Sequence, residues 1–326
     1  MRHRPRRISE ARARALAPLL DRFERAFDKR ARLGFDPVEL PRRFSDRADQ
    51  EVAGLFASAL AYGRADLFKP RLERVLAEMG PSPARFCEAF AMAPRPGAFA
   101  GFQYRFNQPA DIAALAAAAG HVRRAHGALG DRFAALLGAA AGEPEPLRRA
   151  LAVLARELRE APPARALLVG RGARGLGHLL PDPELPGACK RWNLYLRWMV
   201  RGPDEVDLGA WKGVPRSALV IPLDTHVARI ARYLGLTDRE DMTWRTAQEI
   251  TDNLRCLDPE DPVRFDFALC HLGMSGACPL ERDPRRCEVC LLRERCRAKA
   301  RARPGSTTRP APRRRAGATR AGNSGG

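Results

Sequence analysis

The feature that most restricts the fold of this chain is the helical spacing of its apolar residues. Such residues recur three or four positions apart over 8–28, over 49–61 after an acidic start, and through the Ala- and Leu-rich stretch 110–160, with breaks near Gly130 and at 142–144. This spacing is typical of helices, and no stretch alternates apolar and polar residues as a half-buried strand does. We therefore expect an all-α fold of packed helices.

The second half of the chain combines loops with shorter helices. Residues 161–187 are rich in Gly and Pro and predict loops. A strongly amphipathic helix is expected over 190–200, ended by Gly202 and Pro203, and further helices at about 224–235, 243–256 and 262–272. Residues 298–326 consist mainly of Arg, Pro, Gly, Ser and Thr without apolar periodicity, which predicts a disordered basic tail.

The composition indicates a basic, non-membrane protein. With 45% hydrophobic and 29% charged residues, the chain is typical of a globular protein, and no apolar run reaches the roughly 18 residues of a membrane span. The basic N-terminus lacks a following apolar segment, so we expect a cytoplasmic, nucleoid-associated protein rather than a secreted one. The net charge is +19; nine positive charges lie between residues 297 and 320, which leaves +10 elsewhere. Such a charge predicts a nucleic-acid partner.

Half of the eight cysteines lie in one short C-terminal window. A Cys-x2-Cys turn with one further cysteine on either side can bring four thiolates to one centre, and four thiolates suit either zinc or an iron–sulfur cluster. The other four cysteines are scattered and are predicted to be small buried apolar residues. The window contains Cys278, Cys287, Cys290 and Cys296, and the scattered cysteines are Cys87, Cys189, Cys256 and Cys270.

The run Pro-Leu-Asp-Thr-His-Val-Ala-Arg-Ile at 222–230 contains the main candidate for chemistry. Asp224 stands where a helix begins, and an aspartate there is a good N-cap, which is the purely structural interpretation. A carboxylate fixed at this point could also stabilise positive charge on a reacting sugar or activate a nucleophile.

This motif followed by the cysteine window resembles the endonuclease III branch of the helix-hairpin-helix DNA glycosylases. Over most of 45–275, including 196–201 and 258–262, the pattern is similar to the bacterial family DUF2400. The resemblance implies a helix-hairpin-helix domain, Asp224 as the catalytic carboxylate, and a [4Fe–4S] cluster rather than zinc on the four cysteines. The first cysteine gap is two residues longer than in endonuclease III.

Bifunctional members of the superfamily use a lysine nucleophile, and two lysines precede Asp224 in the same region. Lys190 opens the helix after the Leu-Pro-Gly run at 185–187, which looks like a degenerate hairpin; the second hairpin glycine is missing, with Cys189 near its place. Lys212 is closer in sequence but lies in an expected loop. The resemblance favours Lys190, with Lys212 or a monofunctional enzyme as alternatives. A nucleophilic lysine must be partly neutral and so should be desolvated.

The contacts with DNA are predicted from the same resemblance. The segment 59–64 takes the place of the one that fills the gap left by a flipped base, with Leu60 or Tyr62 as an aromatic or apolar wedge; a buried tyrosine is the structural alternative. The remaining predicted contacts are polar or basic residues near the motifs. The full predicted set is Tyr62, Arg64, Arg191, Arg197, Lys212, His226 and Arg229.

The sequence therefore predicts an N-terminal basic helix region (1–44), a helical bundle (45–165), a helix-hairpin-helix glycosylase-like domain (166–275), a four-Cys Fe–S loop (276–297) and a disordered basic tail (298–326). The predicted function is excision of a damaged base, such as an oxidised one, from double-stranded DNA by a monomeric glycosylase, with or without AP lyase activity. The alternatives are a non-catalytic Fe–S DNA-binding protein of the same fold and a zinc-stabilised RNA-associated module.

Overall fold

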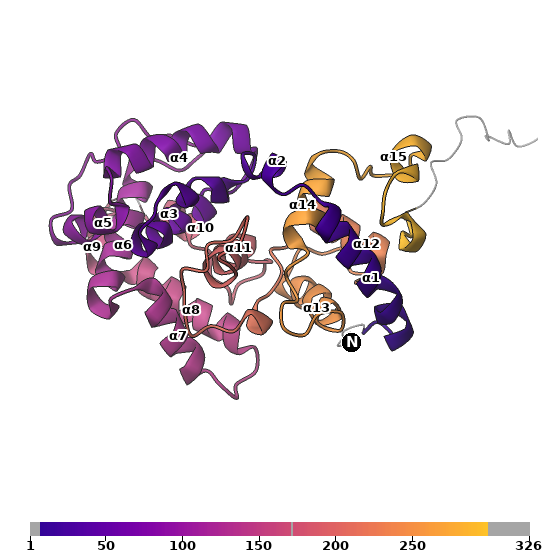
Figure 1. Cartoon of the computed structure of the whole chain (residues 1–326). Coiled ribbons are helices and arrows are strands. Elements are labelled where there is room, and N and C mark those ends of the chain that lie inside the picture. The colour runs from indigo at the N-terminus through magenta and orange to yellow at the C-terminus, as the bar shows by residue number, and fades with distance from the viewer. Residues whose placement is uncertain (1–6, 171, 299–326) are drawn as a thin grey trace, which may run out of the picture.

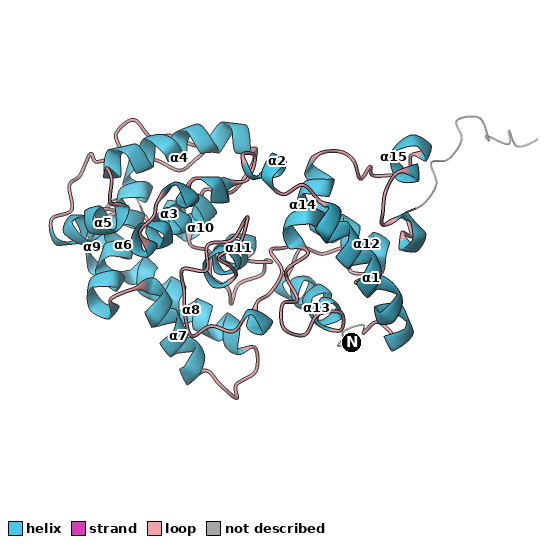
Figure 2. Ribbon diagram, viewed as in Figure 1, coloured by secondary structure: helices cyan, strands magenta, loops and turns pink. Residues whose placement is uncertain are grey.

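The computed structural model describes residues 7–170 and 172–298, and this part of the chain is helical. It contains no β-strand, only an isolated bridge between Tyr104 and Asn107 (Figure 2). None of its helices is long and apolar enough to span a membrane. The prediction of an all-α fold is confirmed. The predicted tail from 299 onward lies outside the described residues.

Most helices of the first half pack around α6 (Pro109–His126), which contacts α5 and α7–α10 (Figure 1). The run of alanines over 113–119 is buried and lets neighbouring helices approach closely. At Gly120 a Cβ would lie 1.8 Å from the Cys87 carbonyl oxygen, so only glycine fits this crossing. The helices of this half are α2 (Arg30–Leu33), α3 (Arg47–Ala59), α4 (Ala65–Met79), α5 (Pro83–Met92), α7 (Leu129–Ala139), α8 (Pro146–Glu160), α9 (Pro162–Ala166) and α10 (Arg174–Leu179), with 3-10 turns at Pro37–Glu39 and Pro41–Arg43.

The N-terminal helix α1 (Glu10–Ala26) packs against the C-terminal helices (Figure 1). The backbone N–H of Ile8 donates to Asn253 Oδ1 at 2.9 Å, and the rings of Phe27 and Phe267 are 6.3 Å apart. The first residues of the chain therefore join its last third in space. The remaining helices are α12 (Thr225–Leu234), α13 (Trp244–Arg255), α14 (Asp266–Met274) and α15 (Pro284–Glu288), with 3-10 turns at Arg216–Ala218 and Arg293–Arg295.

Helix α11 (Lys190–Val200) lies between the two groups of helices (Figure 1). The helix expected over 190–200 is confirmed, but it has no solvent-exposed polar face, because every residue from 192 to 200 is buried. Helix α3 packs against it, and the following loop returns to hydrogen-bond its last carbonyls: Leu208 N–H donates to Trp198 O and Trp211 N–H to Met199 O, both at 2.8 Å. Arg197 can be buried there because it pairs with buried carboxylates.

Two boundaries differ from the sequence prediction. The break expected near Gly130 lies at Gly127, which has φ +84° and ends α6, whereas Gly130 lies within α7. The reason is tertiary: the Trp211 ring packs against Gly130, where a Cβ would lie 2.5 Å from it. The loop-rich region 161–187 also contains the two short helices α9 and α10.

Candidate active site

Asp224 is the N-cap of α12. Its Oδ1 accepts the backbone N–H of His226 at 2.9 Å and that of Val227 at 2.8 Å. Two of the unpaired donors at the start of the helix are thereby satisfied, as expected from the sequence. The capping geometry turns Oδ2 away from the helix, and this second oxygen is therefore available for other contacts.

Lys190, at the start of α11, meets Asp224 across the fold. Its Nζ lies 3.2 Å from Asp224 Oδ2, with 35% of the Lys190 side chain and 13% of the Asp224 side chain exposed. Burial favours the neutral amine, but the adjacent carboxylate outweighs this effect and raises the pKa of Lys190 above its usual value. Burial by itself raises the pKa of the Asp224 carboxyl. The positive charge of Lys190 and the capping N–H groups act against burial, and the pKa of Asp224 is lowered as a result. The resting pair is thus an ammonium and a carboxylate.

An open cleft of about 720 Å³ begins at Lys190. The turn after α3 (61–63), Arg159 of α8, the end of α10 with the following loop (177–189), the start of α11, and the single residues Leu223 and Met242 line it. Its charged and aromatic groups are Lys190, Arg191, Arg159, Asp182, Tyr62 and His178, and Leu185, Leu223 and Met242 contribute apolar walls. The volume is within the range of a pocket for a small planar ligand.

Tyr62 lines the cleft, and contacts with neighbouring side chains fix its position. Its hydroxyl donates to Asn107 Oδ1 at 2.5 Å, and the Arg191 guanidinium lies 5.4 Å from its ring centre. The neighbouring Phe106 is stacked at 6.4 Å from Tyr62 and is 52% exposed. Phe106 is therefore the more accessible aromatic, although the sequence analysis did not select it.

His178 is the second residue that the sequence analysis missed. Its ring lies edge-on to Tyr62 at 4.7 Å and to Phe106 at 4.6 Å. Burial, with the charges of Arg191 and Arg105, lowers the pKa of His178 to about 4, so the imidazole is neutral at pH 7. No local sequence signal marks this residue, since it is one histidine in a Gly-rich loop region that meets Tyr62 only in the folded chain.

The other predicted DNA contacts fall in different environments. Arg64 is exposed and pairs with Asp66 at 2.6 Å, and Lys212 is exposed on its loop, outside the cleft lining. Arg197 is 2% exposed and pairs with Asp207 and Asp266, so it does not reach the surface and has no place in a DNA interface. This correction follows from the burial of α11 on all sides.

Two predicted contacts on α12 serve its packing. His226 lies against Gly273 of α14, where a Cβ would be 2.5 Å from the His226 Cβ. Arg229 donates through one terminal nitrogen to the carbonyl oxygen of Cys278 at 2.9 Å. Arg229 thus connects the helix capped by Asp224 with the cysteine loop.

The four predicted metal ligands line one small cavity of about 30 Å³, together with Tyr233 and Arg293. Within residues 7–170 and 172–298, no group of three or more His, Cys, Asp or Glu side chains is arranged to hold a metal ion. The donor set nevertheless fits a thiolate-bound centre by its chemistry, since four cysteines line one cavity. The ligands concerned are Cys278, Cys287, Cys290 and Cys296.

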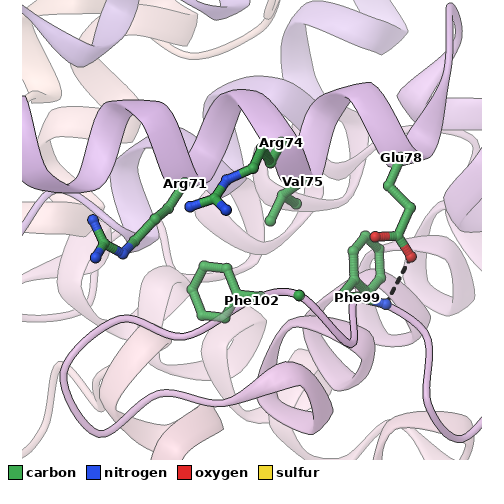
Figure 3. A pocket seen from close by; sticks show the side chains of 7 residues that line it. Arg71, Arg74, Val75, Glu78, Phe99 and Phe102 are labelled. Carbon is green, nitrogen blue, oxygen red and sulfur yellow. Dashed lines mark hydrogen bonds between the residues drawn. The ribbon is translucent and has the colours of Figure 1, made fainter.

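A second cavity, of about 150 Å³, lies between α4 and the loop after α5 (Figure 3). Arg71 and Arg74 project from the helix beside the ring of Phe102, and the Glu78 carboxylate accepts the backbone N–H of Phe99 at 2.7 Å. Arg71 also donates through Nε to the carbonyl oxygen of Gln103 at 2.8 Å. These contacts attach the loop after α5 to α4.

The fold and site define an all-α protein with an open cleft whose lining includes Lys190, and this lysine is paired with Asp224. The chain belongs to the family described as "Protein of unknown function (DUF2400)", whose model matches residues 36–275, well over half of its 326 residues. No curated protein and no solved structure matches the chain.

Proposed function

We propose that this protein is a DNA glycosylase with AP lyase activity, which excises a damaged base from double-stranded DNA. The observation that carries the proposal is the 3.2 Å contact between Lys190 Nζ and Asp224 Oδ2 at the edge of the 720 Å³ cleft. Sequence motifs alone left Lys190 and Lys212 as candidate nucleophiles, and of these two the cleft lining includes Lys190.

The reaction requires Lys190 to change its charge. A neutral amine attacks the sugar C1′, the bond from C1′ to the base breaks, and the base leaves with the bonding electrons and takes up a proton. The attached nitrogen then loses one proton, and its lone pair forms the C1′=N bond of the protonated Schiff base as the C1′–O4′ bond breaks and O4′ takes up a proton. The resting ammonium must first lose a proton, and Asp224 Oδ2 is placed to accept it. DNA bound over Lys190 would exclude the remaining water from this side chain, which is 35% exposed. Desolvation lowers the pKa of a lysine and so favours the neutral amine.

Asp224 contributes charge as well as proton transfer. Asp224 passes the accepted proton on to the departing base, and the carboxylate restored in this way stabilises the positive charge that develops on the sugar. Its position is rigid because Oδ1 is bound to the two N–H groups that start α12. The same residue thus serves as helix cap and as the proposed catalytic carboxylate.

Duplex DNA is proposed to lie across the cleft mouth. Arg64 and Arg191 supply positive charge near it, and the net charge of +19 favours a polyanion. An extruded base could enter the cleft beside Tyr62 and His178, while the exposed ring of Phe106 contacts the bases left behind. Phe106 thereby takes the wedge role that the sequence analysis gave to Leu60 or Tyr62, because the Leu60 side chain is 1% exposed.

The four cysteines are proposed to hold a [4Fe–4S] cluster with a structural role. When bound, such a centre links the chain segments that carry its thiolates. Arg229 of α12 donates a hydrogen bond to the carbonyl oxygen of Cys278. A cluster that fixes the cysteine loop would therefore also stabilise the position of the helix that Asp224 caps. The loop also carries exposed basic residues, among them Arg282, Arg285 and Arg286, which suit phosphate contacts.

The decisive experiment is borohydride trapping on a panel of duplexes that each contain one oxidised, alkylated or abasic residue. Wild-type protein should form a covalent adduct with at least one lesion duplex and none with undamaged DNA. Lys190→Gln should abolish the adduct and keep DNA affinity within about tenfold, which corresponds to roughly 1.4 kcal/mol.

Lys212→Gln is the matched control, because Lys212 is an exposed lysine outside the cleft. It should trap as the wild type does. Trapping that survives in Lys190→Gln and disappears in Lys212→Gln would transfer the nucleophile to the loop. Tight, lesion-selective binding without base release or trapping would instead support the non-catalytic DNA-binding alternative.

A further inference from the structure

Asp224 Oδ2 has a second side-chain neighbour besides Lys190. Cys270 Sγ, on α14, lies 3.3 Å from this oxygen with the thiol as hydrogen-bond donor. From sequence, Cys270 was predicted to be a small buried apolar residue. Its position instead places a polar S–H group beside the carboxylate at the centre of the proposed reaction.

The surroundings of Cys270 keep it protonated. Burial, with the negative charge of Asp224 and those of the more distant Asp266 and Asp36, raises the pKa of the Cys270 thiol well above its ordinary value; Lys190 acts in the opposite direction but does not prevail. A thiol that remains protonated is a poor nucleophile but a constant hydrogen-bond donor. The environment therefore suits Cys270 to hold a carboxylate rather than to attack a substrate.

We propose that Cys270 is a positioning residue that holds Asp224 Oδ2 when Lys190 leaves the ion pair to bond with the sugar. This inference rests on the proposed function. Oδ1 is already committed to the start of α12, and Oδ2 contacts Lys190 and Cys270. Once the Lys190 nitrogen has moved away to bond with the sugar, the thiol is the remaining side-chain donor to Oδ2 among the described contacts.

The contact itself can be tested without any DNA. Iodoacetamide alkylation, followed by peptide mapping at several pH values, should show that Cys270 reacts slowly in the wild type and about tenfold faster at pH 8 in Asp224→Asn, since removal of the negative charge makes the thiolate easier to form. Cys256 is exposed and serves as the internal reference, whose rate should not change. Cys87 is fully buried and should stay unmodified, which shows that the fold is intact. An unchanged Cys270 rate in Asp224→Asn would overturn the proposal.

The role in the reaction is tested by two substitutions at Cys270. Cys270→Val keeps an apolar side chain of similar size but removes the donor, and should lower the rate of borohydride trapping about tenfold at unchanged DNA affinity, as loss of one hydrogen bond to a charged group predicts. Cys270→Ser restores a donor and should trap within about threefold of wild type. Equal trapping rates for Cys270→Val and wild type would refute the role.

Failure of this inference is distinguishable from failure of the proposed function. If wild-type protein traps no duplex, the proposed function is refuted. The alkylation rates of Cys270 in wild type and Asp224→Asn then still test whether the thiol contacts the carboxylate. If wild type and Cys270→Val trap equally, the glycosylase proposal stands and Cys270 has only a packing role.

Discussion

Replacing Asp224 with asparagine separates its two roles. Asparagine keeps an oxygen at Oδ1, so it can still accept the N–H groups of His226 and Val227 and cap α12. It removes the negative charge at Oδ2, 3.2 Å from Lys190 Nζ. Asp224→Asn should therefore lose turnover while the helix still begins at the same residue.

The cost to stability follows from these contacts. Hydrogen bonds to charged groups contribute about 1.5–3 kcal/mol, and we take the lower end, about 1.5 kcal/mol, because Lys190 is 35% exposed. Asp224→Ala loses the cap as well, which adds about 1 kcal/mol. The alanine variant should thus be about 1 kcal/mol less stable than the asparagine variant.

Urea unfolding of the three proteins at pH 7 measures these differences. The pKa of Asp224 is lowered in the folded protein, so its contribution is present above the ordinary aspartate pKa of about 3.9 and is lost as pH falls through the lower folded value. The difference in free energy of unfolding between wild type and Asp224→Asn should therefore persist at pH 5 and become smaller below about pH 4. Equal stability of the Asn and Ala variants would refute the cap argument, and full base excision by Asp224→Asn would remove the catalytic role.

Three further outcomes are expected. The protein purified without oxygen should absorb broadly at about 400 nm, and Cys290→Ser should bleach it; a colourless protein with one bound zinc would exclude the cluster. Binding to duplex DNA should fall with salt with a log–log slope near about −4, and deletion of 300–326 should flatten this slope but keep lesion preference, measured by fluorescence anisotropy. Arg197→Met should destabilise the fold by about 3–5 kcal/mol in urea, because buried Asp266 loses its counter-charge and buried Asp207 keeps only Arg201, whereas the exposed Arg64→Met should leave stability unchanged.

Local sequence was sufficient to predict several of the helices, though not α9 and α10, and the start of α12. Helical spacing predicted α1 and α3 within a few residues, and the Asp-Thr-His run predicted the N-cap at Asp224, because capping depends on groups within three residues of each other. The cysteine spacing predicted a metal centre, which stays a prediction, and the four cysteines line one cavity. These features depend on residues that are near neighbours in the chain.

Only the tertiary structure decided which distant residues meet. Lys190 and Asp224 come from the starts of different helices, and their contact depends on how α11 and α12 are placed. Arg197 lies on a helix that looks amphipathic in sequence, yet neighbours on every side and paired carboxylates bury it. Cys270 was unremarkable in sequence and meets the Asp224 carboxylate only because α14 packs on α12. Side-chain periodicity describes one helix at a time, and it contains no information about which charge a neighbouring helix will bring to its face.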